Sequence, residues 1–321
     1  LGSEIARQLA RDGHEARSLQ RSDPALIEKV PGVAYVRADL TDPESFGDAF
    51  SSVDAVIHVA AMAGVWGKWD SYFAANVQAT RNVVQACRDH KVSLLVHTST
   101  PSVVFNRKAI SNGDESMPYG SNWLCHYAHT KRIAEEEVLA CAAGAGAPFR
   151  AVALRPHLIW GAGDPHLLPR VVDRAKKGRL RIVGKGDNRV DITHVANAAH
   201  AHLCALRSLV ERPKQVNGKA YFITDGEPVR LWDWISEVLR KLEIKPPRSR
   251  VPLPVAYAAG GLLEGVFGGL SLPGEPPMTR FVATELAKDH YFNISRARAD
   301  LAFAPIADRP AEMERMIADL A

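Results

Sequence analysis

The chain has 321 residues, and 46% of them are hydrophobic, which is enough to bury a sizeable core in a globular protein. Lys and Arg number 40 against 36 Asp and Glu, so the net charge is +4 and argues against a nucleic acid as partner. No stretch reaches the roughly 20 apolar residues of a membrane span. The four cysteines form no CxxC pair, which favours free thiols in the cytoplasm and argues against a metal site.

Short apolar strands alternate with amphipathic helices in the first half of the chain. The predicted strands cover residues 15–19, 33–37, 55–59, 94–98 and 151–154. The predicted helices cover residues 3–12, 24–29, 43–51, 70–89 and 125–143. This alternation predicts an α/β fold, a Rossmann-like doubly wound parallel sheet with helices on both faces and ligands at the carboxyl ends of the strands.

Proline and glycine become denser after about residue 154, and helices dominate there apart from a strand predicted at 220–223. We predict a dinucleotide-binding core over residues 1–160 and a smaller, mainly helical substrate-binding lobe over residues 161–321. Late elements of the core interleave with this lobe. The apolar stretch 251–272 is expected to form a buried or lid helix, and a weak membrane-surface contact stays open for it.

The chain begins Leu1-Gly2-Ser3 and runs directly into an amphipathic pattern. A dinucleotide fold opens instead with a strand and a glycine-rich turn, which brings the pyrophosphate to a helix N-terminus. We therefore expect the first strand and most of this turn to be missing from this chain. Gly2 is then the last glycine of the turn, where it lies near the cofactor and lets the helix pack close to the sheet.

Residues that suit a dinucleotide follow three of the predicted strands. Arg21 follows the first of them, where a guanidinium suits a 2′-phosphate, so NADP(H) is favoured and NAD(H) stays open. Asp39, followed by Leu40, offers an acceptor to the adenine amino group. Ala60 and Ala61 are small enough to let a flat cofactor approach the backbone.

Tyr127 and Lys131 stand one turn apart on the predicted helix 125–143. A phenol is protonated at neutral pH, and a neighbouring ammonium lowers its pKa, so that Tyr127 could both give and take a proton. Lys131 could also hold the hydroxyls of a nicotinamide ribose. The spacing by itself is common, and its position after a strand that ends in hydroxyls makes it specific.

Those hydroxyls follow the predicted strand 94–98. Thr100 is the candidate to hydrogen-bond a substrate carbonyl oxygen, with Ser99 and Ser102 as alternatives. At least two of the three are expected to cap the turn instead.

The order of these motifs resembles the extended short-chain dehydrogenases over nearly the whole chain, and within them the 3β-hydroxysteroid dehydrogenase-like branch. The resemblance is carried by Gly2, Asp39-Leu40, Ala60-Ala61, Asn76, Thr98-Ser99-Thr100, Tyr127 with Lys131, Leu154-Arg155-Pro156, and the stretches HTSTPSVVF and YAHTKRIAEEEVLA. Thr100 is a departure, since many members of the family have Ser there. The branch includes reductases of long-chain 2-alkyl-3-oxo acids from bacterial olefin synthesis, and this sequence resembles them most.

The resemblance implies an NADPH-dependent reduction of the ketone of a β-keto acid with two long alkyl chains. It also implies that Tyr127 is the proton donor, that Lys131 is its partner, and that Asn76 and Pro156 lie beside the cofactor. An NAD-dependent 3β-hydroxysteroid or sterol dehydrogenase stays open as an alternative, as does a non-catalytic NADP(H)-sensing regulatory protein. A homodimer or a complex with pathway enzymes also stays open.

The loop 64–69 is aromatic and glycine-rich, and we expect it to form part of an apolar pocket for an acyl chain or a steroid. Further expected members of the pocket are Phe105, Trp123 and Trp160. Lys68 or Arg155 is the candidate to meet a substrate carboxylate.

Overall fold

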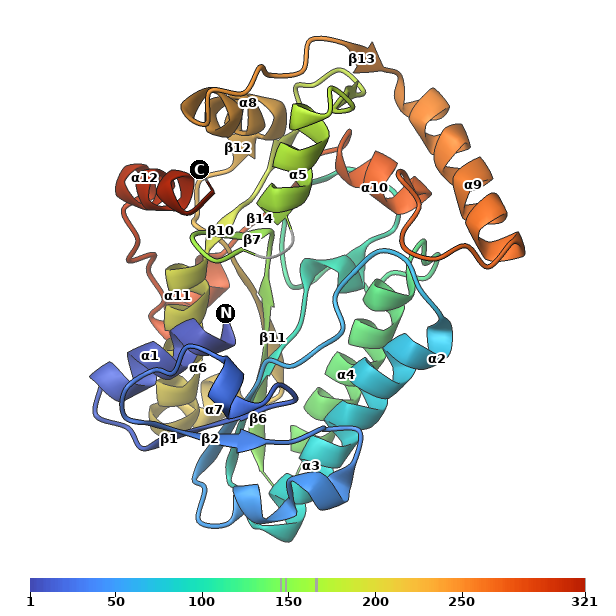
Figure 1. The fold of residues 1–321 in the computed structure, drawn as a ribbon. Helices are drawn as coiled ribbons and strands as arrows, with labels where there is room; N and C mark the ends of the chain where they lie inside the picture. The colour runs from blue at the N-terminus through green and yellow to red at the C-terminus, as the bar shows by residue number, and fades with distance from the viewer. Residues whose placement is uncertain (145, 148, 165–166, 321) are drawn as a thin grey trace.

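A four-stranded parallel sheet forms the centre of the structure, a computed structural model that describes residues 1–144, 146–147, 149–164 and 167–320 (Figure 1). Its strands run in the order β11 (Lys219–Ile223), β6 (Arg150–Pro156), β4 (Leu94–Thr98) and β3 (Ala55–His58). Every residue of β4 is buried, as expected for a strand covered on both faces. The apolar runs in the sequence located all four strands to within two residues at each end.

A second parallel pair consists of β1 (Ala16–Gln20) and β2 (Val33–Arg37), with Ala16 opposite Val33. Among the described residues, neither strand is hydrogen-bonded to β3 as a sheet neighbour. A continuous doubly wound sheet would place one more strand between β1 and β3.

Helices cover both faces of the central sheet. On one face α3 (Ala79–Asp89) and α4 (His126–Ala142) bury apolar side chains together with β4 and the ends of β1 and β2. On the other face lie α1 (Gly2–Arg11), α6 (Val195–Glu211), α7 (Pro213–Val216) and α11 (Ser295–Leu301), with α1 packed on α6. This layered arrangement confirms the predicted α/β class.

The later part of the chain builds a second hydrophobic cluster around Trp160, Trp232 and Met316. Its helices are α5 (Leu167–Lys176), α8 (Leu231–Lys241), α9 (Leu253–Gly269), α10 (Arg280–Glu285) and α12 (Arg309–Leu320). The short strands are β5 (Ile110–Gly113), β7 (Ile159–Trp160), β8 (Ile182–Val183), β9 (Arg189–Val190), β10 (Thr193–His194), β12 (Val229–Arg230), β13 (Arg250–Val251) and β14 (His290–Phe292). The domain boundary at residue 160 stays a prediction.

Three predicted helices differ from the structure. Residues 24–29 contain only the 3₁₀ turn Pro24–Leu26, which Asp23 caps by accepting from the Ala25 N–H. Residues 43–51 contain two 3₁₀ turns, Pro43–Ser45 and Gly47–Phe50. Residues 70–89 form one continuous helical rod of three parts: α2 (Trp69–Tyr72), the π-helical segment η4 (Phe73–Gln78) and α3.

The apolar stretch 251–272 forms α9, and the expectation that this helix is buried is wrong. It lies at the surface with α10 packed along it (Figure 1). Leu262 is 70% exposed and Val255 57% exposed. In the part of the chain that the structure describes, no helix combines the length and the apolar character that crossing a bilayer requires.

A buried ion pair fastens α4 to β6. Arg155 donates two hydrogen bonds to the Glu135 carboxylate, one from Nη2 at 2.5 Å and one from Nε at 3.0 Å. The Tyr119 hydroxyl donates to the same carboxylate at 2.7 Å. The Arg155 guanidinium also lies over the ring of Phe222 on β11, 5.1 Å from its centroid.

We expect Glu135→Gln to lower the free energy of unfolding by about 3–5 kcal/mol, because it leaves the Arg155 charge buried without a counter-ion. Chemical denaturation measures this change. The exposed pair between Arg81 on α3 and Glu137 on α4 supplies the control. Glu137→Gln should lower the free energy of unfolding by less than about 1 kcal/mol. Equal losses in the two variants would contradict the assignment of Arg155 and Glu135 as a stability-determining pair.

Candidate active site

Tyr127 and Thr100 meet at the carboxyl end of β4. Tyr127 lies in the first turn of α4 and packs in a small apolar cluster with Phe105 and Phe281. Its hydroxyl lies close enough to the Thr100 side chain for Thr100 to act on the pKa of the phenol. Thr100 also caps the 3₁₀ turn η5 (Pro101–Val104) by accepting from the Ser102 N–H at 3.2 Å. Thr100 therefore has the capping role expected for part of this hydroxyl cluster, and its expected contact with a substrate oxygen stays a prediction.

The acid–base properties of Tyr127 differ from expectation. Burial raises the pKa of Tyr127 to about 12, and the polar Thr100 side chain opposes this only in part. The predicted lowering of this pKa by Lys131 is wrong for this structure, because the ammonium points elsewhere. At neutral pH the phenol is protonated, which is the state that a proton donor needs.

The Lys131 ammonium is buried and faces β4. Its Nζ donates to the Thr98 carbonyl oxygen at 2.7 Å and lies 3.3 Å from Nε2 of His97. Burial lowers the pKa of Lys131 to about 8, and the negative charge of Glu135 opposes this shift. Sequence reasoning did not identify His97 as a neighbour of Lys131, since 34 residues separate the two along the chain.

Asn76 joins the loop after β3 to α4. Its Oδ1 accepts from the Met62 N–H at 2.7 Å, and its Nδ2 donates to the Met62 carbonyl at 3.1 Å and to Thr130 Oγ1 at 3.0 Å. The side chain is buried and stands on the π-helical segment η4. Asn76 thus fixes the backbone that runs past the expected cofactor position.

The other expected cofactor residues lie at the carboxyl ends of their strands. Ala60 and Ala61 follow β3 and are exposed, and Arg21 follows β1 and is exposed. Pro156 is buried as the last residue of β6. Parallel strands put these ends at one edge of the sheet, where a dinucleotide is bound in folds of this class.

Asp39 and Leu40 also have structural roles. The Asp39 carboxylate accepts from the backbone N–H and the hydroxyl of Thr41, and these bonds lower the pKa of Asp39. The Leu40 carbonyl accepts from the Asn82 side chain at 2.9 Å. Asp39 is therefore held as an ionised acceptor beside the end of β2.

One observation fits a polar ligand at this edge of the sheet. The buried Ser99 hydroxyl at the end of β4 has no hydrogen-bond partner among the described residues. The packing argument for Gly2 is not supported, because a Cβ at Gly2 would meet no atom within 4 Å.

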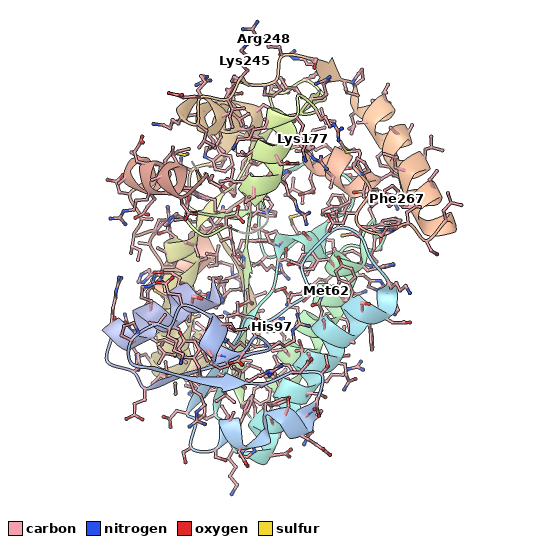
Figure 2. All side chains as sticks on the ribbon, viewed as in Figure 1. Met62, His97, Lys177, Lys245, Arg248 and Phe267 are labelled. Atoms are coloured by element: carbon pink, nitrogen blue, oxygen red, sulfur yellow. The ribbon has the colours of Figure 1, made fainter. Side chains whose placement is uncertain are left out.

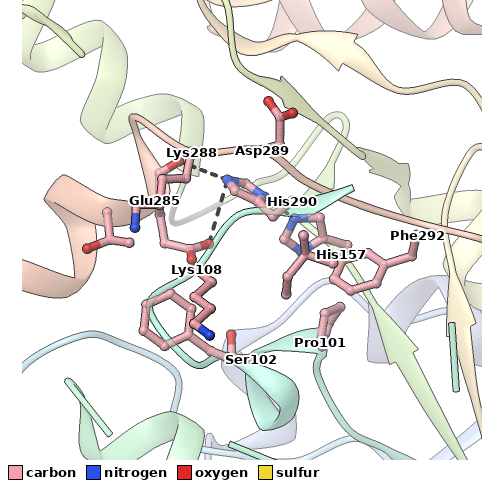
Figure 3. Close-up of a pocket in the computed structure, with 12 residues that line it drawn as sticks. Pro101, Ser102, Lys108, His157, Glu285, Lys288, Asp289, His290 and Phe292 are labelled. Atoms are coloured by element: carbon pink, nitrogen blue, oxygen red, sulfur yellow. Dashed lines mark hydrogen bonds and ion pairs between the residues drawn. The ribbon is translucent and has the colours of Figure 1, made fainter. Parts of the chain in front are cut away.

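A pocket lies beside Ser102, which hydrogen-bonds Thr100 (Figure 3). It is lined by Pro101, Ser102, Phe105, Lys108, Ile110, His157, Thr284, Glu285, Lys288, Asp289, His290 and Phe292. His290 links its two sides, since Nδ1 lies 2.6 Å from Nε2 of His157 and Nε2 lies 2.8 Å from the Glu285 carbonyl. Sequence reasoning had singled out Ser102 and Phe105 among these residues, but not the histidines, because the lining comes from three separate parts of the chain.

Two expectations for the substrate side are wrong. Trp160 is fully buried in the later hydrophobic cluster and donates from Nε1 to Asp225 at 3.0 Å, so it does not line a pocket. Arg155 is committed to Glu135 and does not face a substrate carboxylate. Trp123 stacks on His129 with the ring centroids 5.3 Å apart, and its expected place in the pocket stays a prediction.

Comparisons with known proteins agree with this geometry. Residues 1–255 match the 3-beta hydroxysteroid dehydrogenase/isomerase family. A 2-alkyl-3-oxoalkanoate reductase from Shewanella oneidensis is 41% identical over 100% of this chain and 84% of its own length. A protein of the same name from Stenotrophomonas maltophilia is 41% identical over 95% of this chain and 92% of its own. The human sterol-4-alpha-carboxylate 3-dehydrogenase, decarboxylating, is 31% identical over 89% of this chain and 77% of its own.

Solved structures share the fold. The crystal structure of gox2253 superposes with a TM-score of 0.78 at 26% identity and covers 99% of this chain and 94% of its own. MoeE5 in complex with UDP-glucose and NAD superposes with a TM-score of 0.73 at 20% identity, with the same coverage. These matches confirm the Rossmann-like architecture. The family model and the curated relatives confirm the resemblance seen in the sequence. The chain therefore belongs to the 3-beta hydroxysteroid dehydrogenase/isomerase family and is an oxidoreductase that acts on hydroxyl or keto groups.

Proposed function

We propose that this protein reduces the ketone of a 2-alkyl-3-oxoalkanoate to the corresponding hydroxy acid, with NADPH as the reductant. The observation that carries the proposal is the position of Tyr127 beside Thr100 in a chain 41% identical to two reductases named for that reaction. The pair stands at the edge of the sheet where the dinucleotide of a Rossmann-like fold is bound.

The cofactor supplies a hydride to the carbonyl carbon when it is bound. Tyr127 donates its phenolic proton to the carbonyl oxygen, so that the ketone gains one hydride and one proton and becomes the alcohol. Thr100 donates a hydrogen bond to the same oxygen and holds it beside the phenol. Lys131, whose ammonium is turned toward β4, binds the ribose hydroxyls through its remaining N–H.

The binding residues for the dinucleotide follow from their positions. The first turn of α1, from Gly2, faces the pyrophosphate, and Arg21 meets the 2′-phosphate. Asp39 and the neighbouring Leu40 meet the adenine. Ala60 and Ala61 leave room for the cofactor on the backbone.

The loop 64–69 supports an apolar substrate. Trp66 on this loop approaches α9, where a Cβ at Gly268 would lie 3.9 Å from the Trp66 ring. The pocket beside Ser102 adds hydroxyl, imidazole and ammonium groups at the end of β4, where they can take the polar head of the substrate.

A sterol dehydrogenase is the second candidate. It is favoured by the relatives at 30–34% identity that are named for sterol or 3β-hydroxysteroid dehydrogenation. NADPH or NAD⁺ turnover with 2-alkyl-3-oxoalkanoates and with ketosteroids or sterols distinguishes the two. Binding of NADPH without turnover of any of these compounds would instead favour a sensing role.

With NADPH and a 2-alkyl-3-oxoalkanoate, we expect Tyr127→Phe to lower kcat by about 10²–10⁴-fold, because the proton donor is lost. The dissociation constant of NADPH, measured by fluorescence titration, should stay within a few-fold of the original. Tyr221→Phe is the matched control, since that hydroxyl binds Asp300 in the core and should leave kcat unchanged. Full turnover by Tyr127→Phe would remove Tyr127 from the mechanism.

We expect Arg21→Ala to weaken NADPH binding by about 10–100-fold, since it removes a charge-assisted contact to the 2′-phosphate. NADH binding should not change. Arg11→Ala, at the far end of α1, removes an equal charge and serves as control. If the unaltered protein binds NADH as tightly as NADPH, the proposed preference is wrong.

We also propose that α9 contacts the surface of an anionic membrane. Its outer face has no charge, and its one acidic residue, Glu264, is buried against Arg280. Leu262 stands on that face, and Lys245 and Arg248 project from the loop ahead of the helix (Figure 2). An apolar helix face beside basic residues is the pattern of an interfacial anchor.

Co-sedimentation with phosphatidylglycerol vesicles tests this contact. Leu262→Asp should lower the membrane-bound fraction by about tenfold, since it places a charge where the proposed contact buries leucine in the membrane surface. Leu26→Asp changes another exposed leucine, 83% accessible, and should have no effect. Absence of binding overturns the proposal, and a concentration-dependent dimer that Leu262→Asp disrupts would assign the face to a second copy.

A further inference from the structure

The ring of His97 is the second partner of the Lys131 ammonium. His97 lies on β4 directly before Thr98 and is completely buried (Figure 2). In register it faces His58 on β3, and the two ring centroids are 5.4 Å apart. One strand thus supplies Lys131 with both a carbonyl oxygen and an imidazole nitrogen.

The chemistry of the contact fixes the form of the imidazole. An ammonium can only donate, so Nε2 of His97 must accept and carries no proton. A neutral ring then has its proton on Nδ1. That nitrogen has no hydrogen-bond partner within the described chain. Burial, and next the charge of Lys131, hold the pKa of His97 well below its ordinary value, so the ring is neutral.

The groups around this contact leave Lys131 as the charged member. His58 is bonded to Thr80 on α3, and burial lowers its pKa to about 3. His202 on α6 is bonded to the Thr98 hydroxyl, and burial lowers its pKa to about 4. Glu135, one turn beyond Lys131 on α4, is already paired with a guanidinium.

We propose that His97 is a positioning residue that holds the Lys131 ammonium at the carboxyl end of β4 and aims its remaining N–H away from the sheet. An ammonium has three donors. The Thr98 carbonyl takes one and His97 takes the second, so the third is directed toward the open side where the substrate and cofactor bind. The part concerning catalysis rests on the proposed function.

Removal of the acceptor should change the pH profile of the reductase. The ammonium form of Lys131 is present below its pKa of about 8, so kcat should fall as the pH rises through that value. His97→Leu removes a hydrogen bond to the charged form and should move this alkaline limb down by about one pH unit. It should also lower kcat by about tenfold with little change in KM, since the Lys131 ammonium is no longer held in one orientation.

Two further variants separate positioning from loss of structure. His97→Gln places an amide oxygen near the position of Nε2. It should bring the alkaline limb back close to its original pH and restore most of kcat. His202→Leu removes an equally buried histidine that binds the Thr98 side chain and not Lys131, so the limb should stay in place. A limb in His97→Leu that coincides with that of the unaltered protein would overturn the proposal.

A measurement without substrate or cofactor tests the contact itself. Nitrogen-15 NMR of the imidazole should show His97 neutral and protonated on Nδ1 from about pH 6 to 8. A proton on Nε2, or titration in that range, would refute the contact even if the variants are inactive or unfolded. Because this readout does not depend on turnover, failure of the proposed reaction and failure of the inference give different results.

Discussion

The hydrogen bond from the Lys131 ammonium to the Thr98 carbonyl joins the first half of α4 to the end of β4. A buried ammonium without an acceptor is costly, so this bond restricts how α4 can lie on the sheet. One turn further along the helix, Glu135 and Arg155 make a second fixed contact, this time to β6. Tyr127, on the turn before Lys131, is therefore placed by two polar contacts that it does not itself make.

Tyr127 and Lys131 lie on one helix face, but this position does not bring the ammonium beside the phenol. Their spacing predicts the shared face, yet the ammonium is turned toward the strand. The phenol keeps a high pKa because burial disfavours its charged form. The site is thus built to keep Tyr127 protonated until a bound ligand changes its surroundings.

The sequence predicted those features that depend on neighbours along the chain. The apolar run 94–98 located β4 without error, because a parallel strand buried on both faces must be apolar throughout. The bounds of β2 were also predicted without error, although none of its residues is fully buried. The order of strand end and helix start predicted that Thr100 and Tyr127 belong to one site, and their roles in it stay predictions. Features that depend on distant partners could not be predicted. Arg155 and Trp160 were expected to face a substrate, but their partners, Glu135 and Asp225, are 20 and 65 residues away.

The π-helical segment around Asn76 makes the active-site loop sensitive to the number of residues in a helix. The Ala79 N–H bonds to the Ala74 carbonyl, so this turn holds one residue more than an α-helical turn. An insertion or deletion here would rotate one part of the rod against the other by about 100°. Asn76 could then no longer reach both Met62 and Thr130, although no residue of the site itself had changed. The length of this segment is thus part of the specification of the site, in addition to the identity of its side chains.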